Sequence, residues 1–317
     1  MKLLAQVRVA LRVRHYSRRT DEAYLMWIRR FIVFHGRRHP AELGSAEVSA
    51  FLAHLATERR VSASTQNQAL AALLFMYGEV LRRPVAWMAD LVRAKSPKRL
   101  PVVLTRDEAR AILDKLDGTA SLVCRLLYGS GLRLMEALGL RVQHLEFGRG
   151  EIRVRGGKGD RDRVTMLPVA LQTPLRRQLE VVRAQHDHDL GDGAGWVELP
   201  AALGRKYPRA GREWGWQWVF PGARVHTDAE TSERRRHHLH ETAVQRAFRQ
   251  AVQLSGVDKA AHCHTLRHSF ATELLLSGYD IRTVQELLGH RDVRVTMGYL
   301  HVLNRGGLGV RSPIDTL

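Results

Sequence analysis

Near its C-terminus the chain reads HTLRHSFATELLLSGYDIRTVQELLGH (264–290), and this stretch says most about its fold. The apolar residues of its two halves recur at helical spacing, which predicts two consecutive helices. Asp280 can cap the start of the second helix, and Gly289 can end it. The histidines and arginines of the stretch then fall near helix ends, where side chains of separate elements can meet.

Polar residues in and after this stretch match the needs of a metal-free attack on a phosphate diester. His264 and Arg267 form an H-x-x-R pair, and His290 and Tyr299 follow. The same spacing occurs twice more in the N-terminal part of the chain, so the pair alone carries little weight. Together these residues supply a phenol nucleophile, a guanidinium and two imidazoles, and phosphoryl transfer depends on such positioning and charge stabilisation.

Two further cations stand upstream. Arg133 opens a short helix after a glycine-interrupted helical stretch, and 151–166 alternates apolar and polar residues around a glycine-rich turn. That alternation predicts a β-hairpin with Lys158 at its tip. Arg161 and Arg163 lie close to Lys158, but a guanidinium does not readily give up a proton and so makes a poor acid.

Each of these residues also has an ordinary structural interpretation. Arg133 could be a surface arginine, Lys158 a solvated hairpin tip, His290 a helix cap and Tyr299 a core aromatic. The combination favours the functional interpretation, because four unrelated structural residues would otherwise have to fall at matched spacing by chance.

The bulk composition points to a polyanionic partner. The chain has 317 residues, a formal charge of +18 and a pI near 10.8, which favours two domains and a nucleic-acid partner. Most of the basic residues are arginines, which suit phosphate recognition but also result from a GC-rich genome. The sequence contains no apolar run of the ~18 to 20 residues that a membrane span needs. Cys124 and Cys263 form no disulfide framework, so we expect a cytoplasmic protein with reduced thiols.

The N-terminal part, 1–92, reads as a small helical bundle. Apolar residues recur at helical spacing in three segments, the first of which has Thr20 as its predicted N-cap and Gly36 as its predicted end. Arginines on the outward faces could form a solvated surface or follow a phosphate backbone.

A second domain follows a linker. The interval 93–104 has two prolines, several basic residues and no helical period, which is typical of a linker. Thr105 and Glu108 then form a capping-box pattern that starts the domain 105–317. Within it, a glycine- and tryptophan-rich segment at about 188–238 breaks the pattern and indicates an insertion, either a hydrophobic staple or a binding element.

Two other motifs resemble a nucleotide-binding loop and a metal site, but their spacing fits neither. The GGKGD sequence at 156–160 lacks the glycine and Ser/Thr positions of a P-loop, which argues against nucleotide hydrolysis. Histidines at 237–240 and the HCH sequence at 262–264 fit no familiar zinc spacing, so we expect no metal site.

The segments LYGSGLRLMEALGLRV (127–142), GGKGDRDRVTML (156–167) and 264–290, with the trailing Tyr299, resemble the tyrosine recombinases of the phage-integrase type. The resemblance covers nearly the whole chain. It implies a mainly α fold with a small β-hairpin or sheet, in which a SAM-like helical core-binding domain precedes an α+β catalytic domain. The insertion makes integron integrases the most similar members.

The resemblance also implies roles for individual residues. Arg133 and Arg267 would bind the oxygens of the scissile phosphate, His264 and His290 would hydrogen-bond around it, and Tyr299 would attack to form a 3′-phosphotyrosine. The phenol would lose its proton during the attack, helped by these cations and imidazoles.

Two more roles follow. Lys158 would protonate the leaving 5′ oxygen, and Glu136, three residues after Arg133 on one helical face, would hold that guanidinium. Such chemistry uses neither ATP nor a metal, so no cofactor is expected.

The expected partners are double-stranded integron sites and folded single-stranded cassette sites, recombined by a homotetramer through a Holliday junction at the nucleoid of a bacterium. Residues of the insertion could hold extrahelical bases by stacking: Trp214, Trp216, Trp218, His237 and His238. A DNA-binding regulator without catalysis and a relaxing enzyme of the type IB topoisomerase kind are the alternatives.

Overall fold

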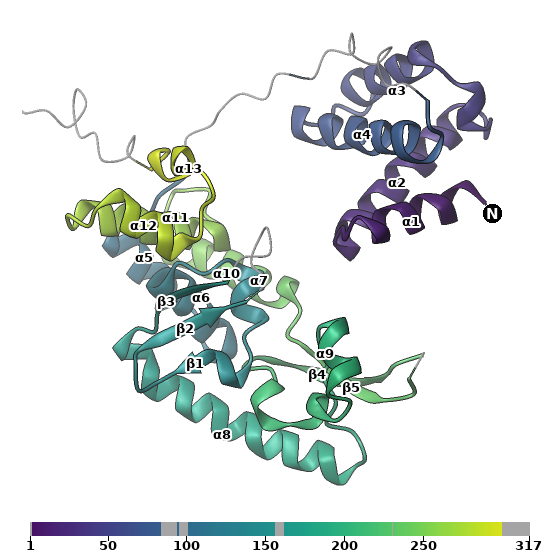
Figure 1. Cartoon of the computed structure of the whole chain (residues 1–317). Helices are drawn as coiled ribbons and strands as arrows, with labels where there is room; N and C mark the ends of the chain where they lie inside the picture. Colours follow the sequence, from purple (N-terminus) through teal and green to yellow (C-terminus); the bar gives the residue numbers. More distant parts are fainter. Residues whose placement is uncertain (1, 84–93, 95–100, 156–161, 230, 300–317) are drawn as a thin grey trace, which may run out of the picture. The chain divides into compact units, whose positions relative to one another are not determined.

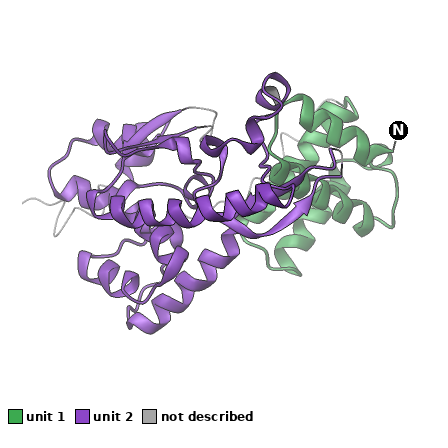
Figure 2. Cartoon of the chain, turned by 90° about the horizontal axis from the view of Figure 1, so that it is seen from below, with its two compact units in different colours: residues 1–99 green, residues 100–317 purple. Residues whose placement is uncertain are grey.

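The computed structural model describes residues 2–83, 94, 101–155, 162–229 and 231–299. It divides into two compact units, Met1–Arg99 and Leu100–Leu317, which Figure 2 colours separately. Most of the interval 93–104, the predicted linker, lies outside the described residues, and so does Lys158. Within the part of the chain that is described, no helix has the length and apolar character needed to cross a membrane.

The first unit is helical, as the sequence predicts (Figure 1). Its helices are α1 (Leu3–Val13), α2 (Arg18–Phe34), the 3-10 turn η1 (Pro40–Glu42), α3 (Ser45–Thr57), α4 (Ala63–Phe75) and the π-helical turn η2 (Met76–Val80). Their apolar faces enclose one core, in which Ile28, Phe31 and Tyr77 are fully buried. The Tyr77 hydroxyl donates to the carbonyl of Pro40 at 3.0 Å, which ties η2 to η1.

Helix α2 begins earlier than the sequence indicates. Ser17 is its N-cap, and the Ser17 hydroxyl accepts the amide of Thr20 at 3.2 Å. The predicted cap Thr20 therefore lies inside the first turn. Both residue types cap well, and the extended backbone at Ser17 decides between them. Gly36 follows the end of the helix with a positive φ, as predicted.

The second unit holds the remaining elements. Its helices are α5 (Arg106–Leu113), α6 (Gly118–Ser130), α7 (Leu134–Leu138), η4 (Val142–His144), α8 (Val169–Gly191), α9 (Ala201–Lys206), η5 (Ala210–Arg212), η6 (Trp214–Trp216), α10 (Glu241–Ser255), α11 (Cys263–Leu276), α12 (Ile281–Leu288) and α13 (Val293–Met297). Its strands are β1 (Leu145–Glu146), β2 (Glu151–Val154), β3 (Arg163–Met166), β4 (Pro221–Thr227) and β5 (Arg234–His238). Three local predictions are confirmed: Thr105 and Glu108 form the capping box of α5, Asp280 caps α12, and Gly289 ends it.

The predicted hairpin is the centre of a small antiparallel sheet. Strands β2 and β3 pair with Ile152 opposite Thr165, and β1 adds a third strand in the order β1-β2-β3. Ile152 and Val154 face the core, as their alternation predicts. A second hairpin, β4–β5, lies in the insertion and was not expected from the sequence, because β4 begins with a proline and a glycine and β5 consists of arginines and histidines.

Close packing of α6 against α11 brings distant segments together. Gly131 ends α6 with φ +64°, and a Cβ there would meet the Phe270 ring of α11 at 2.5 Å. Only glycine permits both this conformation and this approach. Cys124 of α6 and Cys263 of α11 are free and buried, and the neighbouring Cys263 thiol, followed by burial, raises the pKa of Cys124. The end of α6 therefore lies against the middle of α11, beside Arg267 of the H-x-x-R pair.

The insertion is tied to the rest of the unit by buried polar and aromatic contacts. The Arg141 guanidinium lies 3.4 Å from the ring centroid of Trp218, and the Trp218 indole N–H donates to the carbonyl of Arg236 at 3.0 Å. Arg236 in turn pairs with Asp189 of α8 through two hydrogen bonds of 2.7 Å. Trp218 is only 7% exposed, so this tryptophan acts as a hydrophobic staple.

Candidate active site

The N-terminus of α7 places the first cation. Arg133 is the N-cap of this short helix, and its amide donates to the carboxylate of Glu136 at 2.8 Å. The guanidinium of Arg133 donates to the same carboxylate at 2.7 Å. Because backbone and side chain are held by one residue three positions away, the Arg133 guanidinium has a fixed direction.

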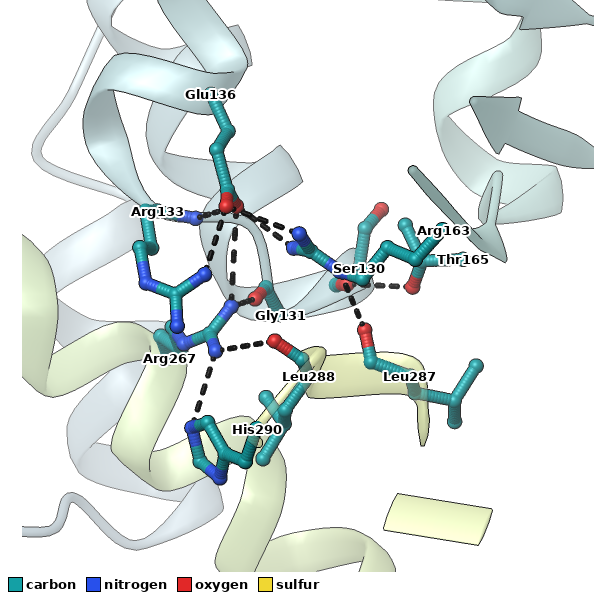
Figure 3. Close-up of polar contacts among 10 residues, drawn as sticks. All are labelled: Ser130, Gly131, Arg133, Glu136, Arg163, Thr165, Arg267, Leu287, Leu288 and His290. Carbon is teal, nitrogen blue, oxygen red and sulfur yellow. Dashed lines mark hydrogen bonds and ion pairs between the residues drawn. The ribbon is translucent and has the colours of Figure 1, made fainter. Parts of the chain in front are cut away.

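The Glu136 carboxylate is the hub of a cluster of guanidinium groups (Figure 3). Arg163 of β3 donates to both its oxygens, at 2.9 and 2.6 Å, and Arg267 lies 3.9 Å away. Burial opposes ionisation of Glu136, but Arg163 and Arg133 outweigh it and lower its pKa to about 2. Three cations against one anion leave an excess of two positive charges, which suits the charge that builds up on phosphate oxygens during transfer.

Arg267 is almost completely buried, with 1% of its surface exposed. Its guanidinium donates to the carbonyl of Gly131 at the end of α6 and, at 2.6 Å, to that of Leu288 in α12. Burial and then the Arg133 cation lower its pKa to about 9, which still leaves it charged at pH 7. Arg267 therefore joins the ends of α6 and α12 to α11 and keeps its charge inside the protein.

His290 follows α12 and has contacts at both ring nitrogens. Its Nε2 lies 3.2 Å from the Arg267 Nη2, and its Nδ1 lies 2.9 Å from the Thr296 hydroxyl. Burial, followed by Arg267 and Arg133, lowers its pKa to about 3. The ring is therefore neutral at pH 7. A guanidinium can only donate, so Nε2 accepts and Nδ1 carries the hydrogen.

Tyr299 is packed against this cluster from the segment after α13. It is 3% exposed, and its ring stacks on His290 with a centroid distance of 6.2 Å. Its hydroxyl lies 2.9 Å from Nδ1 of His268. The centroid of the His268 ring lies 4.5 Å from that of the His264 ring. Burial raises the pKa of Tyr299, against Arg267 and Arg133, which lower it. The phenol is therefore protonated at pH 7.

Comparison with known proteins identifies the two units. The family model described as "Phage integrase family" matches residues 102–305, and "Phage integrase, N-terminal SAM-like domain" matches residues 3–87. The chain belongs to the phage integrase family. An "Integrase/recombinase" of Escherichia coli is 55% identical over all of this chain and 94% of that relative. "Tyrosine recombinase XerA" of Thermococcus kodakarensis is 30% identical over 90% of this chain and 86% of that protein.

The fold of this recombinase agrees with a solved member of the family. A lambda integrase, crystallised as a tetramer bound to a Holliday junction, matches 98% of this chain and 78% of its own, with a TM-score of 0.63 and 17% identity. The predicted fold class, mainly helical with small sheets and a SAM-like N-terminal domain, is confirmed. The chain is a tyrosine-type site-specific DNA recombinase.

The structure of the recombinase brings most of the predicted catalytic residues together. Among the described residues, one cluster contains Arg133, Glu136, His264, Arg267, His290 and Tyr299. An open pocket of about 620 Å³ adjoins it, lined in part by Arg133, Arg163 and His290. Arg133 and Arg163 of the guanidinium cluster therefore border this pocket, whereas Arg267 lies behind them with 1% of its surface exposed.

The residues predicted to hold bases occupy the insertion instead. Trp214 and Trp216 belong to η6, Trp218 follows it, and His237 and His238 end β5. His237 is exposed, and its ring lies parallel to that of Trp218 at 6.4 Å.

Sequence reasoning missed two residues of the cluster. The sequence presents Arg163 only as a residue that could be mistaken for the acid, yet it donates to both oxygens of Glu136 and also to the carbonyl of Leu287 at 2.9 Å. His268 was overlooked, although its position four residues after His264 places both imidazoles on one helical face.

Proposed function

We propose that this recombinase cleaves DNA by attack of Tyr299 on a scissile phosphate held by Arg133 and Arg267. The observation that carries the proposal is the guanidinium cluster around Glu136, with an uncompensated positive charge beside the Tyr299 ring. Attack gives a 3′-phosphotyrosine and expels the 5′ oxygen, which takes a proton from Lys158. The phosphotyrosine conserves the energy of the broken bond, so religation to a second strand needs no ATP.

His264 and His290 assist as neutral hydrogen-bonding groups. Burial and the nearby Arg267 and Arg133 lower the pKa of both imidazoles, so at pH 7 each ring has one N–H and one acceptor nitrogen. His290 is held by Arg267 and Thr296, which orients it toward the pocket beside Arg133.

A suicide substrate tests the cleavage step. In such a DNA a nick lets the released strand diffuse away, so that the covalent adduct accumulates and is counted on a denaturing gel. We expect an adduct with the unchanged protein and none with Tyr299→Phe. Tyr279→Phe is the matched control, because Tyr279 is 56% exposed and should leave adduct formation unchanged.

The outcomes separate the alternatives. Specific binding without an adduct would make the chain a DNA-binding regulator, and an undiminished adduct with Tyr299→Phe would move the nucleophile elsewhere. Relaxation of supercoiled DNA without exchange between two sites would indicate a topoisomerase-like enzyme.

We infer that the substrates are integron sites, including folded single-stranded cassette ends with unpaired bases. The support is the insertion, in which an exposed His237 stands parallel to Trp218 and 5.8 Å from the His226 ring. Aromatic faces bind unpaired bases by stacking, at roughly 1 to 3 kcal/mol each. Since Trp218 is buried under Arg141, the base contacts fall to Trp214, Trp216, His237 and His238.

Binding measurements test this substrate class. The folded strand is compared with the same hairpin lacking its extrahelical bases, for the unchanged protein and for Ala substitutions at His237 and Trp216. We expect each substitution to weaken binding to the folded strand about 5- to 160-fold and to leave the base-deleted hairpin unaffected. Equal effects on both DNAs would remove the stacking role.

We also propose that four copies act together on a Holliday junction, at the nucleoid in the bacterial cytoplasm. The support is family membership and the likeness of the fold to a lambda integrase tetramer. Light scattering of the protein on a synthetic junction should give a mass of four chains, and a stable dimer as the largest species would contradict the tetramer.

A further inference from the structure

The hydroxyl of Tyr299 already has a defined partner. His268 Nδ1 lies 2.9 Å from the Tyr299 oxygen, with the two rings at 51° and 5.4 Å between centroids. The contact joins α11 to the segment after α13 across 31 residues of sequence. Tyr299 is 3% exposed, so bulk water has little access to the phenol. The proton that must leave during attack therefore faces an imidazole.

The other imidazoles of the site are placed differently. His290 uses Nε2 to accept from Arg267 at 3.2 Å and Nδ1 to meet Thr296 at 2.9 Å. Accepting a proton would place a cation against the Arg267 guanidinium, which is unfavourable. The His264 and His268 rings are nearly perpendicular, with 4.5 Å between their centroids. Among the described residues, the imidazole hydrogen-bonded to the Tyr299 hydroxyl is His268.

We propose that His268 takes the proton of Tyr299 during strand cleavage and returns it during religation, an inference that depends on Tyr299 being the nucleophile. As the bond from Tyr299 Oη to phosphorus forms, the O–H bond breaks and the proton moves to His268 Nδ1. The bond from phosphorus to the 5′ oxygen breaks, and that oxygen takes a proton from a separate acid. Religation reverses each transfer, so His268 ends neutral.

The charges around His268 agree with this role. Burial, followed by His264, His262 and Arg267, lowers its pKa to about 4, and His290 also faces it. The ring is therefore neutral at pH 7, and Nδ1 is free to accept if Nε2 carries the hydrogen. This low pKa of His268 applies to the site without DNA, where positive charge is in excess. A DNA phosphate brings negative charge there and raises the pKa of the imidazole, so the acceptor becomes stronger when substrate binds.

Substitution by asparagine separates proton transfer from positioning. The side-chain oxygen of His268→Asn can stand near the place of Nδ1 and accept the phenol hydrogen bond, but an amide does not take up the proton. General-base catalysis typically contributes 10²- to 10⁴-fold, so single-turnover cleavage should fall about 10²-fold or more. DNA affinity and thermal midpoint should stay near those of the unchanged protein. His188→Asn on α8 is the matched control, with a side chain 77% exposed.

A modified substrate locates the defect. In DNA with sulfur in place of the bridging 5′ oxygen, the leaving thiolate needs no proton, so loss of the general acid is rescued while loss of the base is not. We expect His268→Asn to remain slow on this DNA and its rate on normal DNA to rise with pH, because phenolate must then form in solvent.

Three results would overturn the proposal while leaving Tyr299 as nucleophile. These are a His268→Asn rate within about threefold of the unchanged protein, full rescue by the sulfur substrate, and faster cleavage, which would mean that His268 restrains Tyr299. Absence of an adduct with the unchanged protein would instead refute the proposed function.

Discussion

Replacing Glu136 by glutamine should destabilise the catalytic unit more than its small change in shape suggests. The carboxylate accepts hydrogen bonds from Arg133 at 2.7 Å and Arg163 at 2.6 Å, and Arg267 lies 3.9 Å away. Its side chain is 9% exposed, so water screens these charges weakly. Glu136→Gln keeps the volume but leaves three guanidinium groups without the carboxylate that they share.

The size of the loss follows from the pKa. Glu136 has a pKa of about 2 in the folded protein, against about 4.3 for a free glutamate, and at 1.36 kcal/mol per unit this gives about 3 kcal/mol. Removal of one partner of a buried ion pair costs about 3 to 5 kcal/mol, which agrees. Because the folded pKa is depressed, this stability is fully present above about pH 4.3 and is lost as the pH falls towards 2.

Urea unfolding at pH 7 measures the effect. We expect Glu136→Gln to lower the free energy of unfolding by about 3 kcal/mol and the thermal midpoint by about 6 to 12 °C for a domain of this size. Glu146→Gln is the control, because Glu146 is 43% exposed and lies 3.6 Å from Arg153, so its loss should stay within about 1 kcal/mol. At pH 3 the Glu136→Gln deficit should shrink to about 1.4 kcal/mol. A deficit under about 1 kcal/mol at pH 7, or one unchanged at pH 3, would refute the electrostatic reasoning.

Three further results are expected. Arg163→Lys should slow single-turnover cleavage about 10²-fold with little loss of DNA affinity, because an amine cannot replace the forked contact to Glu136; an unchanged rate would remove the positioning role. Gly131→Ala should cost about 2 kcal/mol or more in urea unfolding, since its Cβ would meet Phe270 at 2.5 Å and its φ is +64°, whereas Gly148→Ala, with open space around it, should be near neutral. DNA affinity should fall steeply and linearly on a log-log plot against salt, and a flat dependence would contradict extensive phosphate contact.

Local features of the fold could be predicted from the sequence because they depend on residues close together in the chain. The capping box at Thr105 and Glu108, the cap at Asp280 and the end at Gly289 each involve neighbours within a helical turn. The hairpin followed from alternation on both sides of a glycine-rich turn. The cap of α2 was wrong by one turn, because Ser17 and Thr20 are both good capping residues and only the backbone path distinguishes them.

The sequence by itself indicated the family, because the motifs that contain Arg133, His264, Arg267, His290 and Tyr299 resemble those of tyrosine recombinases. It also singled out these residues as the ones that we propose for the chemistry. Only the tertiary structure decided which groups those residues touch. Glu136 meets Arg163 across 27 positions, and His268 meets Tyr299 across 31. Such pairs depend on how helix ends and a strand pack around the core. The periodicity of apolar residues shows which face of a helix or strand is buried. Which other element packs against that face depends on the tertiary structure, and periodicity does not contain that information.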